Sequence, residues 1–384
     1  MAGLHPTVDP DGLLEFSVVY TDRALNHMSQ RFQGVMRELH AALTQTYHAA
    51  SAVIVPGSGT FGMEAVTRQF ANQQPVLVVR NGWFSYRWTQ ILDAGGIASH
   101  STVCMARPLS SEAQAAWAPC PIDEVTQAIH TNRPAVVFAP HVETSAGMLL
   151  PNDYLVKLAQ ATHEVGGLLV LDCIASGALW VDMQALGVDV LVTAPQKGWS
   201  ASPACAMVML GERAVAALAT TQSSSFACDL KRWHGIMQAY LNGGHAYHTT
   251  MPTDALVTLA QTMREMQAYG YSKVQDEQWA LGQMVRELLA QRGFASVAAP
   301  GYEAPGVVVC HTTDPELHNG KKFMQAGLQT AAGVPLQCNE PEGFCTFRIG
   351  LFGLDKLHHP QRAVAHLASA LDTIGYPAAQ AAPA

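Results

Sequence analysis

Residues 168–199 read LLVLDCIASGALWVDMQALGVDVLVTAPQKGW, and this stretch decides the fold. A first apolar run ends at Asp172, and a second run, residues 188–192, shortly precedes Lys197. Short apolar runs of this kind are typical of buried strands. In an open parallel sheet, ligands bind beyond the carboxyl ends of the strands, and the separation of Asp172 and Lys197 leaves room for a short crossover. We therefore expect both side chains at one edge of one sheet.

A lysine and an aspartate placed in this way allow two interpretations. An enzyme that uses pyridoxal phosphate needs a lysine that forms a Schiff base and a carboxylate that keeps the pyridine nitrogen protonated. Alternatively, Asp172 caps a helix and Lys197 is a solvated loop residue. This stretch alone favours neither interpretation, so the other segments have to decide.

The bulk composition limits the classes of protein that fit. A chain of 384 residues is long enough for two domains, and a charged fraction of only 14% indicates extensive buried surface, including a subunit interface. A net charge of −8 without a basic run argues against nucleic acid as a partner. No apolar stretch approaches the ~20 residues of a membrane span, so we expect no membrane contact, and the N-terminus lacks a signal-peptide pattern.

The cysteines and histidines show no metal-binding pattern. Eight cysteines and sixteen histidines include no CxxC, no paired zinc spacing and no HExxH. Cysteines in this arrangement are typical of reduced core residues in a cytosolic protein. We therefore expect a cytoplasmic protein without a metal site.

Strand and helix patterns alternate along most of the chain. This alternation predicts an α/β fold in which helices flank a mainly parallel sheet, followed by a smaller C-terminal α/β domain. We place an N-terminal arm at 1–20, a large domain at 21–270, a small domain at 271–376 and a tail at 377–384. The predicted strands are 52–55, 76–79, 136–138, 168–171, 188–192, 207–210, 306–310 and 345–349. The predicted helices are 24–47, 61–70, 152–165, one from Thr253, 276–293, 321–328 and 360–374, while residues 221–235 resemble a polar loop.

Several polar or aromatic residues follow predicted strands. The turn at 57–60 opens a helix and offers free backbone N–H groups to an anion, although an ordinary capped helix is the commoner result. One aromatic ring in residues 83–88 could stack on a flat cofactor, whereas most of these rings must belong to the core or an interface. Glu143, Thr144 and Ser145 also follow a strand. Arg348 lies on an apolar strand, where a substrate carboxylate or a carboxylate of the protein would pair with it.

Six segments carry a recognisable pattern in combination, although none is decisive alone. They are GSGTFGMEAV, RNGWFSYRW, HVETSAGMLLP, LDCIAS, APQKGW with YHTTMP, and FRIGLFG. Together they resemble the class V aminotransferases, which are fold type I pyridoxal phosphate enzymes, and most closely the alanine–glyoxylate and serine–glyoxylate (serine–pyruvate) branch. The similarity extends over about residues 24–376.

The resemblance implies pyridoxal 5′-phosphate as the cofactor and a site shared between two subunits. It implies that Lys197 forms the Schiff base and moves protons, and that Asp172 pairs with the pyridine nitrogen. It further implies that the cofactor phosphate is bound by Ser58, Gly59, Thr60 and Gln196, and that the ring lies between Phe84 and Ile174, with a hydrogen bond from Thr144 near the ring hydroxyl. Arg348 would bind the substrate carboxylate. In a homodimer, Tyr247 and Thr250 would contact the cofactor phosphate of the neighbouring subunit.

The resemblance implies a ping-pong transamination. The amino group of a small amino acid, alanine or serine, would move to a 2-oxo acid, glyoxylate or pyruvate. The alternatives on this fold are a lyase or cysteine desulfurase and a 2-aminophosphonate transaminase. Desulfurases of this class carry a histidine before the lysine and a histidine on the ring, where this chain has Gln196 and Phe84, but Cys338 and Cys345 leave a cysteine nucleophile open. A non-catalytic binding protein is disfavoured because Lys197 and Asp172 are both present.

Two departures from the family pattern affect the substrate side. The usual PGP segment near the N-terminus is replaced by FSVVYTDRALNHMS. The resemblance then implies that the residues near the substrate are Tyr20, Thr21, Asp22, Arg23 and Asn26. The glycine-rich loop before the substrate arginine is replaced by VPLQCNEPEGFCTF. Because neither change touches the cofactor side, the cofactor follows more firmly from the resemblance than the amino donor does.

Overall fold

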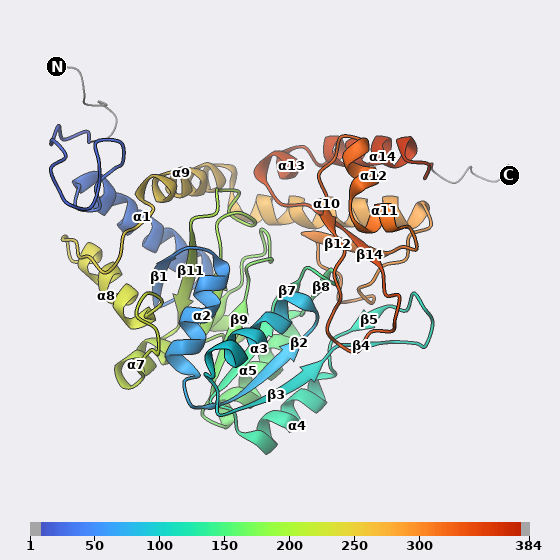
Figure 1. Cartoon of the computed structure of the whole chain (residues 1–384), viewed down its shortest axis with the longest axis horizontal. Coiled ribbons are helices and arrows are strands. Elements are labelled where there is room, and N and C mark those ends of the chain that lie inside the picture. Colours follow the sequence, from blue (N-terminus) through green and yellow to red (C-terminus); the bar gives the residue numbers. More distant parts are fainter. Residues whose placement is uncertain (1–8, 378–384) are drawn as a thin grey trace.

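The structure is a computed structural model that describes residues 9–377, so almost all of the predicted tail and residues 1–8 of the predicted arm lie outside the described part. A seven-stranded sheet with the order β1-β11-β10-β9-β6-β2-β3 occupies its centre (Figure 1). The strands are β1 (Ser51–Pro56), β2 (Pro75–Arg80), β3 (His100–Met105), β6 (Val136–Pro140), β9 (Leu168–Asp172), β10 (Val190–Thr193) and β11 (Cys205–Leu210).

The sheet is mainly parallel, as predicted. Only β11 runs antiparallel to its two neighbours, β1 and β10, while β10, β9, β6, β2 and β3 pair in parallel. β9 and β10 are direct neighbours, with Val192 opposite Asp172. Both strands are almost uninterrupted runs of buried aliphatic residues, which is typical of strands covered on both faces. Their carboxyl ends therefore meet at one edge, where Asp172 lies and the segment to Lys197 begins.

Helices pack against the sheet and continue into the C-terminal part. Figure 1 shows α2 and α3 in front of the strands; α2 contacts β10 and β11, and α3 contacts β2 and β6. The helices are α1 (Gln30–Tyr47), α2 (Gly59–Phe70), α3 (Trp83–Gly95), α4 (Ile122–Asn132), α5 (Asn152–Glu164), α6 (Met183–Leu186), α7 (Glu212–Thr220), α8 (Leu230–Leu241), α9 (Thr253–Tyr269), α10 (Tyr271–Gln291), α11 (Pro315–His318), α12 (Lys321–Gln325), α13 (Leu354–His358) and α14 (Pro360–Thr373).

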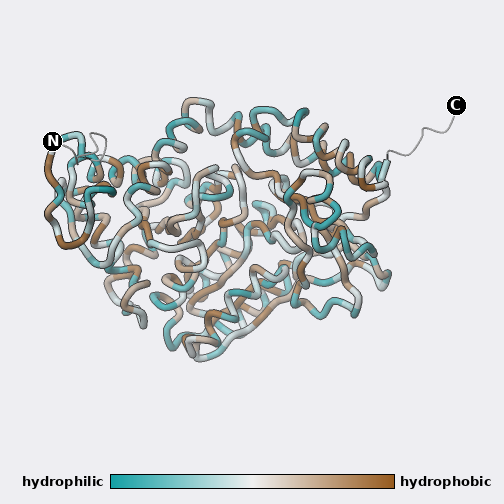
Figure 2. Tube along the Cα trace, turned by 45° about the horizontal axis from the view of Figure 1, so that its top comes forward, coloured by the Kyte–Doolittle hydropathy of each residue, from teal (hydrophilic) through white to brown (hydrophobic). Residues whose placement is uncertain are grey.

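The long helices are amphipathic, and their colours alternate along the tube in Figure 2. In α1 the apolar face formed by Phe32, Val35, Met36, Leu39 and Leu43 is buried, at the three- and four-residue spacing that places side chains on one side of a helix. No helix within residues 9–377 combines the length and the apolar character that crossing a bilayer requires.

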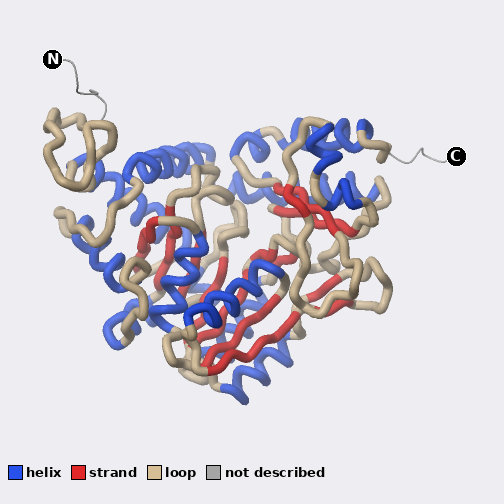
Figure 3. The backbone as a smooth tube through the Cα atoms, viewed as in Figure 1, coloured by secondary structure: helices blue, strands red, loops and turns tan. Residues whose placement is uncertain are grey.

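A second, three-stranded antiparallel sheet lies near the C-terminal helices (Figure 3). Its order is β12 (Val307–His311), β14 (Thr346–Gly350) and β13 (Ala331–Ala332). Two short hairpins complete the strands, formed by β4 (Arg107–Pro108) with β5 (Trp117–Ala118) and by β7 (Val142–Glu143) with β8 (Met148–Leu149). The division of the chain into domains at Gly270 stays a prediction.

Some predicted element boundaries are wrong. α1 begins at Gln30 rather than at residue 24, because the Ser29 side chain accepts the N–H of Phe32 and caps the helix there. The expected polar loop at 221–235 ends at Leu230, where Asp229 caps α8. The helix expected to reach residue 328 ends at Gln325. The sequence patterns also did not predict β3, α4 or α7.

Candidate active site

The predicted cofactor residues come from several strand ends of the large sheet. The turn after β1 opens α2, the turn after β2 opens α3, and Asp172 ends β9. Because these strands run in the same direction, their carboxyl ends lie along one edge. The edge therefore collects side chains that are far apart in the sequence, as expected for a ligand site in an open α/β sheet.

Asp172 is buried at this edge, with 7% of its surface exposed. One carboxylate oxygen accepts the N–H of Ile174 at 2.9 Å, and the other has no hydrogen-bond partner among the described residues. Burial raises the pKa of Asp172 to about 6, although this hydrogen bond and nearby Lys197 oppose the shift. A buried carboxylate with one unused oxygen fits the role of partner to a protonated ring nitrogen.

The amine of Lys197 lies near two aromatic rings. Its Nζ is 5.9 Å from the centre of the Phe84 ring and 5.8 Å from that of Phe352. The loop that carries Lys197 packs directly on the loop after Asp172, because a Cβ at Gly198 would lie 2.1 Å from the carbonyl oxygen of Gly177. Close approach of these two backbones fixes the lysine beside Asp172.

Burial lowers the pKa of Lys197 below its ordinary value, and the neighbouring positive charge of Arg348 adds to this effect, while Asp172 opposes it. A lowered pKa raises the neutral fraction of the amine, which is the form that attacks a carbonyl or accepts a proton. The lysine is therefore suited to covalent and acid–base chemistry.

The N-terminus of α2 offers an anion site. Ser58 stands at the N-cap position, but its side chain makes no capping hydrogen bond, and the first backbone N–H groups of a helix lack partners within the helix. A Cβ at Gly59 would lie 2.6 Å from Ile174, so this turn approaches the Asp172 loop closely. Arg87 donates to the hydroxyl of Thr60 at 3.2 Å and adds positive charge. These groups fit a phosphate.

Arg348 reaches this region from the second sheet. Its guanidinium carbon lies 5.5 Å from the centre of the Phe84 ring, and its Nε donates to the carbonyl of Ala332 at 2.7 Å. It forms no ion pair within residues 9–377. Phe84 thus has Lys197, Arg348 and Arg87 near its ring, the last with its guanidinium carbon at 5.2 Å.

Four further residues were predicted to bind the cofactor, and two of them lie away from Lys197 in sequence and are exposed. Thr144 is buried beyond β7, and Gln196 is exposed beside Lys197. Tyr247 and Thr250 lie next to each other, with their hydroxyl oxygens 3.2 Å apart. Tyr247 is 53% exposed, and its ring centre lies 5.6 Å from that of His27. Their role toward a neighbouring subunit stays a prediction.

Three residues of the site were not assigned a role from the sequence. Arg87 and Phe352 lie in the motifs RNGWFSYRW and FRIGLFG, but no local pattern distinguishes them from core or surface residues. Glu143 follows a predicted strand, which was the available signal, but only the structure shows that its carboxylate accepts the backbone N–H groups of Phe84 and Ser85.

The two cysteines that could have supported desulfurase chemistry differ in exposure: Cys338 is buried and Cys345 is partly exposed. Cys338 is 4% exposed, its thiol donates to the carbonyl of Arg80 at 3.5 Å, and burial raises its pKa to about 12. Burial also raises the pKa of Cys345. A nucleophilic cysteine needs an accessible thiolate, so the buried thiol of Cys338 does not fit that role.

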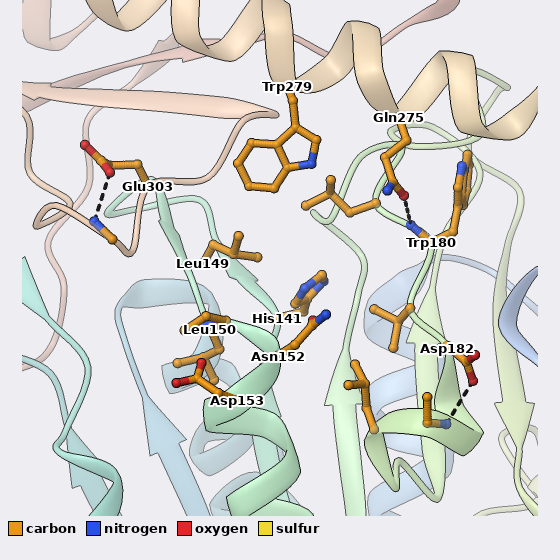
Figure 4. A pocket seen from close by; sticks show the side chains of 16 residues that line it. His141, Leu149, Leu150, Asn152, Asp153, Trp180, Asp182, Gln275, Trp279 and Glu303 are labelled. Carbon is orange, nitrogen blue, oxygen red and sulfur yellow. Dashed lines mark hydrogen bonds between the residues drawn. The ribbon is translucent and has the colours of Figure 1, made fainter.

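A separate cavity of ≈ 580 Å³ lies between α5, α6 and α10. Figure 4 shows His141, Trp180 and Trp279 around it. None of the predicted cofactor or substrate residues lines it. This cavity is therefore not the space beside Lys197.

Comparison with known proteins identifies a family and a fold. Residues 14–342 match the class-V aminotransferase family. The chain is 28% identical over 330 residues to a 2-aminoethylphosphonate–pyruvate transaminase of Burkholderia ambifaria, covering 84% of this chain and 83% of that protein. It is also 28% identical over 334 residues to the transaminase of the same name from Salmonella paratyphi B, covering 83% and 84%.

Two solved structures share the fold. The alanine–glyoxylate aminotransferase from Nostoc sp. superimposes with a TM-score of 0.74 at 21% identity and covers 91% of this chain and 88% of its own. The pyridoxamine–pyruvate aminotransferase from Mesorhizobium loti gives a TM-score of 0.76 at 17% identity, with 95% and 88% covered. The fold is thus the fold type I arrangement that the sequence motifs predicted.

Proposed function

The chain belongs to the class-V aminotransferase family and is a transaminase that depends on pyridoxal 5′-phosphate, and we propose that it transfers the amino group of a small amino acid, alanine or serine, to glyoxylate or pyruvate. The single observation that carries the substrate side of this proposal is the position of Arg348, whose terminal nitrogens make no hydrogen bond among residues 9–377 and can bind one small anionic group near Lys197.

The residues at the sheet edge fit the cofactor. We assign the covalent link to Lys197, the ring nitrogen to Asp172, the ring faces to Phe84 and Ile174, the neighbourhood of the ring hydroxyl to Thr144, and the phosphate to Ser58, Gly59, Thr60 and Gln196. The unused oxygen of Asp172 and the uncapped N-terminus of α2 support these assignments. When bound, the cofactor withdraws electrons from the carbon that loses its proton.

The protein contributes proton transfer and orientation. With the cofactor bound, the Nζ of Lys197 would move the proton from the α-carbon of the donor to the cofactor, and in the second half-reaction it would move a proton from the cofactor to the carbonyl carbon of the acceptor. Burial favours the neutral amine that this step needs. Arg348 holds the substrate carboxylate so that the α-carbon faces Lys197, and the rings of Phe84 and Phe352 lie close to the amine.

A half-reaction screen tests the amino donor. The holoenzyme is mixed with L-alanine, L-serine or 2-aminoethylphosphonate in the absence of a 2-oxo acid, and loss of the visible cofactor absorbance is recorded. We expect L-alanine or L-serine to bleach the band and pyruvate or glyoxylate to restore it. A band that changes only with the aminophosphonate would overturn the proposed donor.

2-Aminoethylphosphonate with pyruvate is the second candidate substrate pair. It is favoured by the 28% identity over most of the chain to transaminases of that name. The same guanidinium would bind a phosphonate, since arginine forms paired hydrogen bonds with phosphate-like groups as well as with carboxylates. The donor screen separates the two candidates directly.

We also propose a homodimer located in the cytoplasm. The exposed positions of Tyr247 and Thr250 support a role at a subunit interface. All eight cysteines are free thiols, which agrees with a reducing compartment. Size-exclusion chromatography with light scattering tests the oligomeric state.

A further inference from the structure

Glu143 lies next to the cofactor residues, although the proposed mechanism gives it no role. It is the last residue of β7 and is completely buried, with 0% of its surface exposed. Within residues 9–377 it forms no ion pair. A buried carboxylate without a cationic partner has to be stabilised by hydrogen bonds.

Five hydrogen bonds reach this carboxylate. One oxygen accepts the N–H of Phe84 at 3.2 Å and both the N–H and the hydroxyl of Ser145, at 3.0 and 2.7 Å. The other accepts the N–H and the hydroxyl of Ser85, at 2.8 and 2.7 Å. Three of these contacts come from backbone N–H groups, which can only donate, so the carboxylate oxygens are the acceptors there.

These contacts take the place of an N-cap side chain, which α3 lacks. Its N-cap residue is Gly82, which has no side chain, so the first N–H groups of the helix are bound by Ser145 and Glu143 instead. A Cβ at Gly82 would lie 2.0 Å from the hydroxyl oxygen of Ser145 and 2.8 Å from Glu143. Glycine is therefore required there for the carboxylate to reach the helix.

We propose that Glu143 is a positioning residue for the cofactor: by holding the N-terminus of α3, its carboxylate fixes the Phe84 ring on which the cofactor stacks. Phe84 is the second residue of α3, and its own N–H is one of the bonded groups. The Glu143 carboxylate also lies close enough to Arg348 and Lys197 to raise the pKa of both side chains, which opposes the lowering by burial. This inference rests on the proposed role of Phe84 in stacking.

Titration of the apoprotein with pyridoxal 5′-phosphate, followed by visible absorbance, tests the inference without any substrate. Glu143→Gln replaces one acceptor oxygen with an N–H₂ group that faces other donors. We expect about tenfold weaker cofactor binding, the loss typical of hydrogen bonds to a charged group. Wild-type affinity in this variant would overturn the proposal. If the wild-type protein itself binds no cofactor, the proposed function fails instead.

Asp189→Asn is the matched control for stability. Asp189 is also a buried carboxylate, but it binds Arg213, His163 and the N-terminal end of β9, at the opposite edge of the sheet. We expect this variant to melt earlier and still bind the cofactor as tightly as the wild type. Equal weakening in both variants would mean that general destabilisation explains the effect of Glu143, and the proposal would be wrong.

A double-mutant cycle tests whether Glu143 affects cofactor binding through Phe84. Phe84→Leu keeps an apolar side chain but removes the flat face. If Glu143 acts through Phe84, Glu143→Gln should weaken cofactor binding in the wild type but add little in the Phe84→Leu background. Additive losses would contradict the proposed route. Should Glu143→Gln fail to fold, Ser145→Ala, which removes one hydroxyl from the network, should give the same pattern on a smaller scale.

Discussion

The guanidinium of Arg348 lies over the ring of Phe84, with its carbon 5.5 Å from the ring centre. The two residues come from distant parts of the chain, since Phe84 is the second residue of α3, which follows β2 of the large sheet, and Arg348 lies in β14 of the second sheet. The Nε of Arg348 donates to the carbonyl of Ala332, and within the described part of the chain its terminal nitrogens make no hydrogen bond and can receive a ligand. The proposed carboxylate-binding residue, Arg348, therefore lies directly beside the proposed cofactor-stacking residue, Phe84.

Arg348→Ala should reduce kcat/KM for the amino donor roughly tenfold to hundredfold, because hydrogen bonds to a charged group contribute about 1.5–3 kcal/mol. Arg348→Lys should recover only part of the loss, since an ammonium lacks the paired geometry. Steady-state kinetics measure both, with Arg264→Ala, which breaks a surface ion pair to Glu38, as the control. Unchanged kinetics in Arg348→Ala would refute the carboxylate assignment.

Lys197→Ala should abolish transamination and the visible absorbance of the covalently bound cofactor, while leaving the fold intact, because the side chain is only part-buried and makes no hydrogen bond among the described residues. Absorbance spectra and circular dichroism test this. Lys273→Ala is the control, since that amine lies 4.1 Å from the Tyr269 ring, away from the site. An absorbance band that survives in Lys197→Ala would contradict the assignment.

Asp172 should make the apoprotein less stable as the pH rises. Its pKa in the fold is about 6, above its ordinary value of 3.8, so the folded state holds the proton more tightly than the unfolded chain. The free energy of unfolding should therefore fall between about pH 4 and about pH 6, by about 3 kcal/mol in total. In Asp172→Asn, which has no carboxyl group at this position, this fall of the free energy of unfolding should be absent.

Thermal melting of the apoprotein measures the effect. At about pH 8, Asp172→Asn should melt at a higher temperature than the wild type and yet be inactive, whereas near pH 4 the two should melt alike. Asp189→Asn should instead melt earlier, since it loses the ion pair to Arg213 and disturbs the contact to His163. A lower melting temperature for Asp172→Asn at about pH 8 would show that burial does not govern this carboxylate.

The sequence predicted those parts of the fold that depend on local patterns. The aliphatic runs before Asp172 and Lys197 identified two neighbouring parallel strands, because strands covered on both faces consist of such runs. β3 was not predicted, since HSTVCM is mostly half-buried and mixes polar with apolar residues. Likewise, the start of α8 depends on one capping residue, Asp229, within a polar segment.

The site was predictable only where a residue type has a specific chemical meaning. Lys197 and Asp172 follow from the chemistry of the cofactor, and the turn at 57–60 from helix geometry. Glu143 could not be assigned, because its function consists of contacts to a helix start that lies 58 residues away in the sequence. Such long-range pairings depend on the strand order, which the sequence alone does not contain.

Cys338→Ser should leave transaminase activity unchanged and should not affect any sulfur chemistry. The thiol is buried and donates to the carbonyl of Arg80, and a serine hydroxyl can make the same bond. Measuring alanine production from L-cysteine alongside transamination distinguishes the activities. Desulfurase activity that disappears in Cys338→Ser would support the rival lyase instead.

Mixed dimers should reveal whether two chains share each site. Lys197→Ala chains keep Tyr247 and Thr250, while chains with Tyr247→Phe and Thr250→Ala keep Lys197. Each variant alone should be impaired, the second through weaker cofactor binding. If the exposed pair serves the neighbour's phosphate, a mixed dimer contains one site with every residue intact, so co-refolding the two variants should restore activity. Co-refolded Lys197→Ala with wild-type chains provides the reference. No gain above the separately refolded variants would place each site within a single chain.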